Sequence, residues 1–319
     1  MSCPACFRGA AHNHAEPKGT METIHGMRTY VAGGSDPARS KSAIIYLPDA
    51  FSLKLVNNKL LADEYAAGTG CKVYIPDVVM NGGMEPSLMS KMEILMTPNP
   101  SWTITGVVSK ISTALTLIPS IVPFLLFAHP SKIYPKILSF ARAVKADLPP
   151  GGKLGAAGFC WGAWPATKLC VETTSTTGTT TAAPDSDTSA TSSRLIDAQF
   201  NGHPSYMVKT PEMVVDAIRK FKVPYSCAVA ENDMQFNKAE AEKVEARLRE
   251  VVGASTTGGG TTSGGQGEGE GCTYEFKIYD GCVHGFCVRA PMGKYDDTNE
   301  SGYEGAKRQA VEWFNKYLN

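Results

Sequence analysis

The residues of this sequence whose types and spacing predict chemistry lie in the segment Gly158-Phe-Cys-Trp-Gly162. A strand-like run, Lys153-Leu-Gly-Ala-Ala, precedes the segment, and a helix-compatible stretch from Ala163 to Val171 follows it. A chain that reverses sharply between a strand and a helix needs small residues two places before and two places after the turning residue, and the two glycines occupy those places. The pattern predicts a nucleophile elbow with Cys160 as the nucleophile.

An elbow of this kind holds Cys160 at the N-terminus of the following helix, where the helix dipole and free backbone N–H groups favour a thiolate. An unassisted thiol has a pKa of roughly 8.5 and is mostly protonated at neutral pH, so a base is expected further along the chain. Most buried cysteines are small apolar core residues, and the motif therefore needs partners before it indicates catalysis.

Two later strand-like runs are each followed by a suitable partner. Asp233 comes just after the run 224–230, and His284 comes just after the run 274–279. Open α/β sheets place their sites at the carboxyl ends of their strands, where both residues fall. The order nucleophile, acid, histidine is that of an α/β-hydrolase triad, so we predict a triad of Cys160, Asp233 and His284.

These motifs identify a resemblance to the dienelactone hydrolase family, and in particular to its fungal branch, over nearly the whole chain apart from two low-complexity insertions. The segments that carry it are Gly158-Phe-Cys-Trp-Gly162, Ala230-Glu-Asn-Asp233, His284-Gly-Phe-Cys-Val-Arg289, Tyr46-Leu-Pro-Asp-Ala-Phe51, Asn58-Lys-Leu-Leu-Ala-Asp-Glu-Tyr65, Gly202-His-Pro-Ser205 and Cys3-Pro-Ala-Cys-Phe-Arg-Gly9. The resemblance implies an α/β-hydrolase fold with a mostly parallel central sheet, helices on both faces and a small helical cap insertion. It also implies an ester or lactone hydrolase that needs no cofactor.

Further site residues follow from the elbow geometry and from the resemblance. The elbow makes the backbone N–H of Trp161 one oxyanion donor, and the loop after the strand 43–47 should supply the other, from Ala50. Asp49 stands where bacterial members carry a glutamate that contacts the resting nucleophile, although an Asp after a proline also forms turns. Phe51 is expected to border the substrate with it.

Arg289 resembles the family arginine that binds the carboxylate of dienelactone. The family's second arginine is missing, because the sequence after the strand 72–76 reads Val78-Val-Met-Asn-Gly-Gly. A fully bound carboxylate usually has two such partners, so a larger and less charged ester or lactone is expected. His203 lies at the end of another strand and either borders the pocket or has a structural role.

The composition limits the partners and the compartment. Lys plus Arg equals Asp plus Glu at 31 each, so no net field draws nucleic acid or an anionic membrane, and a nucleic-acid partner is not expected. The start, 1–8, lacks the apolar core of a secretory signal, and nine cysteines is an odd count that suits free thiols, so a cytoplasmic protein is expected. Either a monomer or a homodimer fits the sequence.

A metal site is not expected. Cys3, Cys6, His12 and His14 have the residue types of a zinc knuckle. No second cysteine pair accompanies them, only one residue separates the two histidines, and the segment lies at a terminus.

The alternation of strand-like and helix-like runs predicts one domain over residues 1–319. Residues 78–131 break this rhythm and contain a stretch, 111–131, without Lys, Arg, Asp or Glu. Because Pro119 and Pro123 interrupt that stretch, we expect a pair of short helices capping the site rather than a membrane contact. Segments 173–193 and 255–271 are rich in Thr, Ser, Ala and Gly, which predicts flexible surface loops.

The expected reaction is attack of the Cys160 thiolate on an ester or lactone carbonyl, followed by hydrolysis of the acyl-enzyme with His284 as the base. Two other classes of function remain open. The same triad could serve a cofactor-free isomerase, cyclase or acyl transferase, and the fold could belong to a ligand-binding protein without chemistry.

Overall fold

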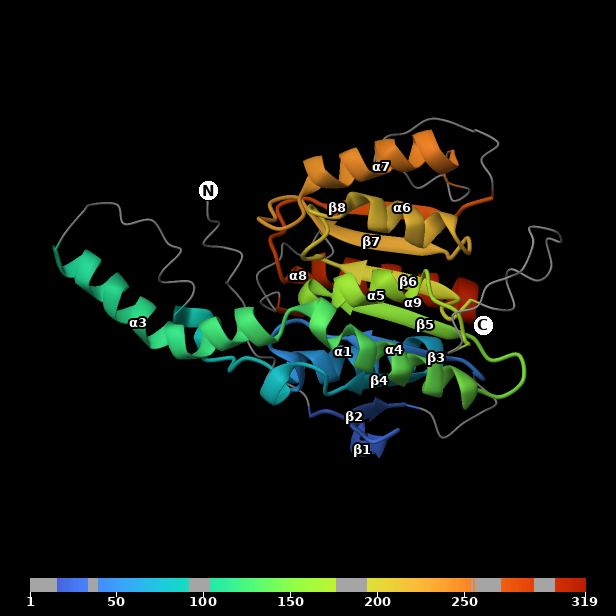
Figure 1. Ribbon diagram of the computed structural model, residues 1–319, viewed down its shortest axis with the longest axis horizontal. Helices are drawn as coiled ribbons and strands as arrows, with labels where there is room; N and C mark the ends of the chain where they lie inside the picture. The colour runs from blue at the N-terminus through green and yellow to red at the C-terminus, as the bar shows by residue number, and fades with distance from the viewer. Residues whose placement is uncertain are drawn as a thin grey trace.

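An eight-stranded sheet forms the centre of the protein (Figure 1). The computed structural model describes residues 16–33, 40–91, 104–175, 194–253, 255, 271–289 and 302–319. The strands are β1 (Thr20–Ile24), β2 (Met27–Ala32), β3 (Ala43–Leu47), β4 (Lys72–Pro76), β5 (Leu154–Phe159), β6 (Ala198–Gly202), β7 (Tyr225–Ala230) and β8 (Tyr274–Tyr279).

The strand order is β1-β2-β4-β3-β5-β6-β7-β8. All pairs from β4 to β8 are parallel, whereas β1 pairs with β2, and β2 with β4, in the antiparallel sense. The expected mostly parallel sheet is therefore confirmed. The sequence did not predict β1, whose five residues are exposed or nearly so and lack the apolar alternation of a strand.

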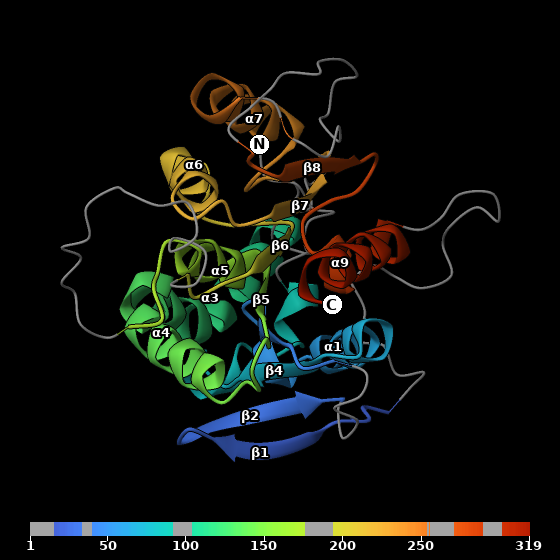
Figure 2. The ribbon, with the colours of Figure 1, turned by 90° about the vertical axis from the view of Figure 1, so that its right-hand side faces the viewer.

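Helices cover both faces of the sheet, as Figure 2 shows edge-on. One core lies between the sheet and α4, α5, α6 and α7, and the other lies between the sheet and α1, α8 and α9. The helices are α1 (Val56–Thr69), α3 (Ile104–Phe127), α4 (Pro130–Ala146), α5 (Ala163–Leu169), α6 (Pro211–Arg219), α7 (Lys238–Val252), α8 (Phe286–Arg289) and α9 (Gly302–Leu318), with 3-10 turns η2 (Ser52–Lys54), η3 (Met80–Gly82) and η4 (Cys160–Gly162). This arrangement confirms the α/β-hydrolase fold.

Strand β5 lies at the centre of the sheet and is fully buried, yet it is built of small residues. A Cβ atom on Gly155 would lie 2.9 Å from a methyl of Leu318 and 3.0 Å from the ring of Phe314, both on α9. The glycine thus lets α9 press directly against the strand that carries the elbow.

The later part of the insertion, residues 104–127, forms one long helix where we expected two short ones. Helix α3 runs unbroken over 24 residues and includes both Pro119 and Pro123. A proline removes one helix hydrogen bond and bends the helix but does not have to end it, and Figure 1 shows α3 bending while it extends away from the sheet. Its C-terminal end reaches the body, where Phe124 packs on the core. A capping role for the insertion stays a prediction.

Other predictions fall wholly or largely outside the described residues. These are the cysteine and histidine residues of the zinc-like pattern, at 3, 6, 12 and 14, and most of the segments 173–193 and 255–271. Across the helices that the structure does describe, none combines the length and the apolar character that crossing a membrane requires.

The close packing of α9 on β5 predicts that Gly155→Val destabilises the protein. A valine would force the buried ring of Phe314 aside, and overpacking of this kind costs about 1 to 3 kcal/mol. Urea unfolding measures the change. Lys277→Val, on an exposed position of β8, is the control and should shift the free energy of unfolding by less than about 0.5 kcal/mol. Equal effects for the two variants would contradict this account of β5.

Candidate active site

The segment around Cys160 has the geometry of a nucleophile elbow. Strand β5 ends at Phe159, η4 covers the turn, and α5 begins at Ala163. Cys160 has a φ of 50°, a left-handed conformation that a non-glycine residue adopts only when its surroundings enforce it. A Cβ on Gly162 would lie 2.0 Å from the carbonyl oxygen of Leu47, so only glycine allows the turn to meet the loop after β3.

Asp233 and His284 come together beside the elbow, although they lie on loops after different strands. His284 Nδ1 is 2.9 and 3.0 Å from the two carboxylate oxygens of Asp233, and both residues are buried. Asp233 Oδ1 also accepts a hydrogen bond from the Gln235 amide at 2.7 Å, which fixes the carboxylate. With Nδ1 held by the carboxylate, the other ring nitrogen, Nε2, is the atom available to the thiol.

The electrostatics of the site favour a charged Cys160–His284 pair. Burial by itself raises the pKa of the Cys160 thiol, but the positive charge of His284 and a hydrogen bond from its ring bring that pKa below its ordinary value. Burial likewise lowers the pKa of His284, whereas the charges of Asp233 and Cys160 hold it above its ordinary value. Both directions favour a thiolate next to an imidazolium, which is the form that an activated cysteine takes.

Ser205 also contacts the nucleophile, and the sequence did not single it out. Its hydroxyl lies 3.4 Å from Cys160 Sγ, and its amide donates to the Cys160 carbonyl at 3.0 Å. The hydroxyl lowers the pKa of the Cys160 thiol further. Ser205 follows the end of β6, the strand between those that precede Cys160 and Asp233, and this placement is the signal that could have found it.

The loop after β3, where one oxyanion donor is expected, lies against the elbow. The loop and the elbow are in close contact at Gly162, where an added Cβ atom would lie only 2.8 Å from the Pro48 carbonyl oxygen. On this loop the Phe51 amide donates to Asp49 Oδ1 at 3.1 Å, and the Ala50 amide remains the candidate donor. The second candidate is the amide of Trp161, whose indole N–H is fixed by the Ala128 carbonyl at 2.6 Å.

Asp49, Phe51 and Arg289 form one buried cluster next to this loop. Asp49 Oδ1 accepts hydrogen bonds from the Phe51 amide and from Asn58 Nδ2, both at 3.1 Å. Arg289 Nε lies 3.7 Å from Asp49 Oδ2, and the guanidinium lies over the ring of Phe51 at 5.3 Å. Asp49 thus shapes the turn, and its charge also acts on Cys160, whose pKa it raises. The geometry is therefore compatible both with a turn-forming Asp49 and with an Asp49 that acts on the resting nucleophile.

His203 is fully buried behind the triad. Its ring meets that of His284 edge-on at 5.0 Å and also packs near Phe159 and Phe286. Burial, with the charges of His284 and Arg289, keeps the pKa of His203 well below its ordinary value. In this position His203 is a neutral packing partner of the catalytic histidine, which favours the structural role.

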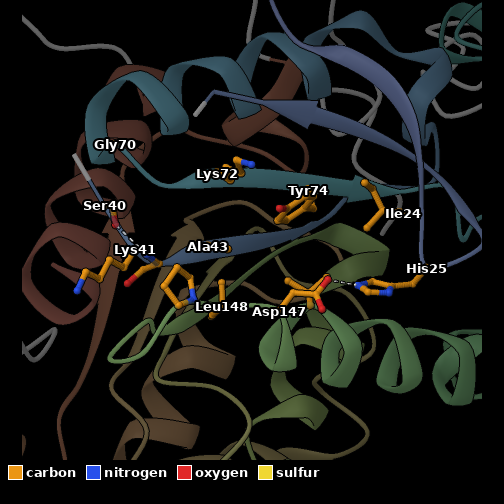
Figure 3. Close-up of a pocket in the computed structure, with 13 residues that line it drawn as sticks. Ile24, His25, Ser40, Lys41, Ala43, Gly70, Lys72, Tyr74, Asp147 and Leu148 are labelled. Atoms are coloured by element: carbon orange, nitrogen blue, oxygen red, sulfur yellow. Dashed lines mark hydrogen bonds and ion pairs between the residues drawn. The ribbon is translucent and has the colours of Figure 1, made fainter. Parts of the chain in front are cut away.

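A hollow of about 320 Å³ lies at the opposite edge of the sheet, where β3 and β4 begin (Figure 3). An ion pair between His25 and Asp147, 2.9 Å apart, lies at its side. None of the triad residues lines it. Within the described part of the chain, no group of three or more His, Cys, Asp or Glu side chains could hold a metal ion.

If Cys160 and His284 form a charged pair, Cys160 should react with iodoacetamide at a pH where an ordinary thiol does not. Because its pKa is lowered, its rate should level off at a lower pH than that of a free thiol, whose rate still rises about tenfold per pH unit below about 8.5. Peptide mapping by mass spectrometry measures the rate at each cysteine. Asp233→Asn should move the Cys160 profile to higher pH, because His284 loses the carboxylate that keeps it charged.

Cys282 is the internal control for this measurement, since it is also partly exposed but burial and two acidic neighbours raise the pKa of its thiol to about 11. At neutral pH Cys160 should react at least about tenfold faster than Cys282. Equal rates, or a Cys160 profile centred near 8.5, would refute the ion pair.

Ser205→Ala should weaken the thiolate without removing it. A hydrogen bond to a charged group contributes about 1.5 to 3 kcal/mol, so losing this bond should raise the pKa of Cys160 and move its alkylation profile to higher pH. Ser205→Thr keeps a hydroxyl and should leave the pKa closer to that of the wild type. An unchanged profile in the alanine variant would mean that Ser205 only fixes the backbone through its amide.

Several known proteins resemble this chain over most of its length. The hydrolase tropI of Talaromyces stipitatus is 23% identical over 320 aligned positions that cover 100% of this chain and 96% of tropI. Dienlactone hydrolase 1 of Gibberella moniliformis is 28% identical over 167 positions, about half of each chain. Among solved structures, a candidate dienelactone hydrolase from Klebsiella pneumoniae superposes with a TM-score of 0.54 at 13% identity, covering 94% of this chain and 98% of its own.

A second similar structure is esterase 2 of Thermogutta terrifontis phosphorylated by paraoxon, with a TM-score of 0.53, 14% identity and 96% of each chain covered. At such identities the structures show a shared fold. The sequence model of the dienelactone hydrolase family matches residues 27–252, which is well over half of the chain and includes Cys160 and Asp233. With the elbow and the order of the strands, this match shows that the chain belongs to the dienelactone hydrolase family.

Proposed function

We propose that this chain, by its family a hydrolase of the ester and lactone class, acts through a covalent acyl-enzyme on Cys160. The observation that carries the proposal is the buried His284–Asp233 pair beside a cysteine whose pKa is lowered. A thiol without a catalytic role does not need a fixed base, and five other cysteines of the described chain are simply buried.

In the first half of the reaction, the Cys160 thiolate attacks the carbonyl carbon of the substrate and a C–S bond forms. The π electrons of the carbonyl move to its oxygen. When the carbonyl reforms, the C–O bond to the leaving group breaks, and the imidazolium of His284 gives its Nε2 proton to the leaving oxygen. A lactone keeps this alcohol attached to the acyl group, whereas an ester releases it.

In the second half, neutral His284 takes a proton from water at Nε2, and the hydroxide attacks the thioester carbon. Collapse of the intermediate breaks the C–S bond, releases the carboxylic acid and restores the thiolate next to the imidazolium. Asp233 remains ionised throughout and holds the ring through Nδ1. The amides of Trp161 and Ala50 donate to the oxyanion in both halves, and losing one such donor costs about 2.7 to 4 kcal/mol in the barrier.

The charge of Arg289 supports a substrate without a carboxylate. Its guanidinium already faces Asp49 and lies over Phe51 in a buried cluster, so its charge is largely balanced within the protein. The segment 78–83, where a second arginine would stand, has no basic residue. The aromatic side chain of Tyr206 lies near the nucleophile, whose charge helps to raise the pKa of its phenol. We therefore assign an uncharged, largely apolar ester or lactone as the substrate class.

Cys160→Ala should abolish turnover of a short p-nitrophenyl ester, with a loss of at least about a thousandfold, because removing a nucleophile removes the whole covalent route. Intact-protein mass spectrometry of the wild type, quenched during turnover, should show a transient species heavier by one acyl group. The variant should never carry that mass.

Cys282→Ala is the control, since it removes another partly exposed thiol and should keep both the rate and the acyl species. If Cys160→Ala releases p-nitrophenol as fast as the wild type, the covalent mechanism is wrong. An acyl mass on Cys160 that persists in water and disappears only when an alcohol or amine is added would show an acyl transferase.

A further inference from the structure

Helix α3 presents a row of apolar side chains to solvent. We call Val108, Ile111, Leu115, Ile118 and Val122 the outer stripe. With Leu126 and Phe127 beyond its end, these seven side chains keep between 43% and 62% of their surface exposed, and they account for most of the exposed large hydrophobic side chains of the described chain. An apolar surface concentrated on one element in this way marks an interaction site.

The outer stripe is not the side by which α3 attaches to its own protein. The side roughly opposite carries Leu117, which is buried, and Phe124, which packs on the core. A surface helix of a soluble protein normally opposes its inner apolar face with a charged one, but the only charged residue in these 24 positions is Lys110. The helix therefore has two apolar sides, and the fold of one chain covers only one of them.

The spacing of the outer stripe points to another helix as its occupant. Its steps are three, four, three and four residues, which are the a and d positions of a heptad over the central part of α3. Pro119 and Pro123 do not occupy stripe positions. A heptad seam is narrow and matches one facing helix, whereas helices that lie on a lipid surface usually carry a Lys- and Arg-rich polar face that α3 lacks.

A second copy of the same helix fits this seam. In an antiparallel pair with the two-fold axis between Leu115 and Ile118, Leu115 of each copy faces Ile118 of the other, and Ile111 faces Val122. Each a position then meets a d position, and the contact closes on itself as a two-fold interface must. The seam contains no charge, and the whole chain has equal numbers of basic and acidic residues, so no long-range repulsion opposes pairing.

The contact is also large enough. The 24 residues of α3 form a helix about 36 Å long at 1.5 Å per residue, and Figure 1 shows it reaching clear of the sheet, where another molecule can approach. Specific interfaces bury roughly 1,200 to 2,000 Å² in total. Leu126 continues the outer stripe, and these six half-exposed apolar side chains from each of two copies, with the residues beside them, reach the lower part of that range.

We propose that α3 is a dimerisation helix, and that two copies of this chain pair antiparallel through the outer stripe. This inference is independent of the reaction at Cys160. It assigns a partner to the one helix that Figure 1 shows projecting from the body.

Sedimentation equilibrium of the full chain over a range of concentrations tests the proposal. The wild type should approach twice the chain mass of 34.1 kDa. The double variant Leu115→Glu, Ile118→Glu should remain at the mass of one chain, with association weakened at least about a hundredfold, because pairing would bury four unpaired charges. Its far-ultraviolet circular dichroism should match the wild type and its unfolding should stay cooperative, which shows that the body is folded, while its midpoint should be lower because it lacks the stabilisation of the dimer.

The matched control is Ser109→Glu, Thr116→Glu, which adds the same charges to exposed positions of the same helix off the outer stripe. This variant should still form a dimer. A photo-reactive benzoylphenylalanine at position 115 should cross-link two chains, with the cross-linked peptide spanning position 118 of the other copy.

The proposal fails if the wild type keeps the mass of one chain at every concentration, or if the stripe variant still forms the dimer. It also fails if the cross-link reaches a segment outside α3. Flotation with phosphatidylcholine and phosphatidylserine vesicles provides the remaining arm. A wild type that floats with vesicles but stays monomeric in solution would assign the outer stripe to a lipid surface instead.

Discussion

The positive charge on His284 is the condition on which the site depends. Burial alone would leave both the imidazole and the Cys160 thiol neutral and unreactive. The charge persists because Asp233 places two carboxylate oxygens 2.9 and 3.0 Å from Nδ1, and because the thiolate supplies a second negative charge. Removing one member of such a set leaves another charge buried without compensation, so the three groups act as one unit and must be positioned together.

The parallel part of the sheet does this positioning. Strands β5, β6, β7 and β8 are neighbours in that order, and the loops after their carboxyl ends carry Cys160, Ser205, Asp233 and His284 in the same order. Each of these strands thus places one polar side chain at the carboxyl end of the sheet. The small residues of β5 let α9 press on one face, while Gly162 lets the elbow touch the loop after β3. These close backbone contacts therefore fix the position of Cys160.

The triad could be predicted from the sequence because each member sits in a local pattern: a strand, a tight turn and a suitable residue in a known order. For Ser205, the place after β6 is visible in the sequence, but its contact with Cys160 depends on the distance between two loops, which no local pattern encodes. The same holds for the pair of Asp49 and Arg289, which joins opposite ends of the chain. The prediction of two short helices in place of α3 is wrong because Pro119 and Pro123 bend this helix without ending it, and one sequence does not distinguish a bend from an end.

Trp161 links helix α3 to the active site. Its indole N–H is held by the carbonyl of Ala128, the residue directly after α3, and its backbone amide is the donor that we assign to the oxyanion. A movement of the C-terminal end of α3 would therefore reach the site through a single side chain. The outer stripe lies nearer the N-terminus of α3, away from that hydrogen bond. Changes at Leu115 and Ile118 alter the surface of α3 without altering the contact at Ala128, and for this reason pairing and catalysis can be separated by experiment.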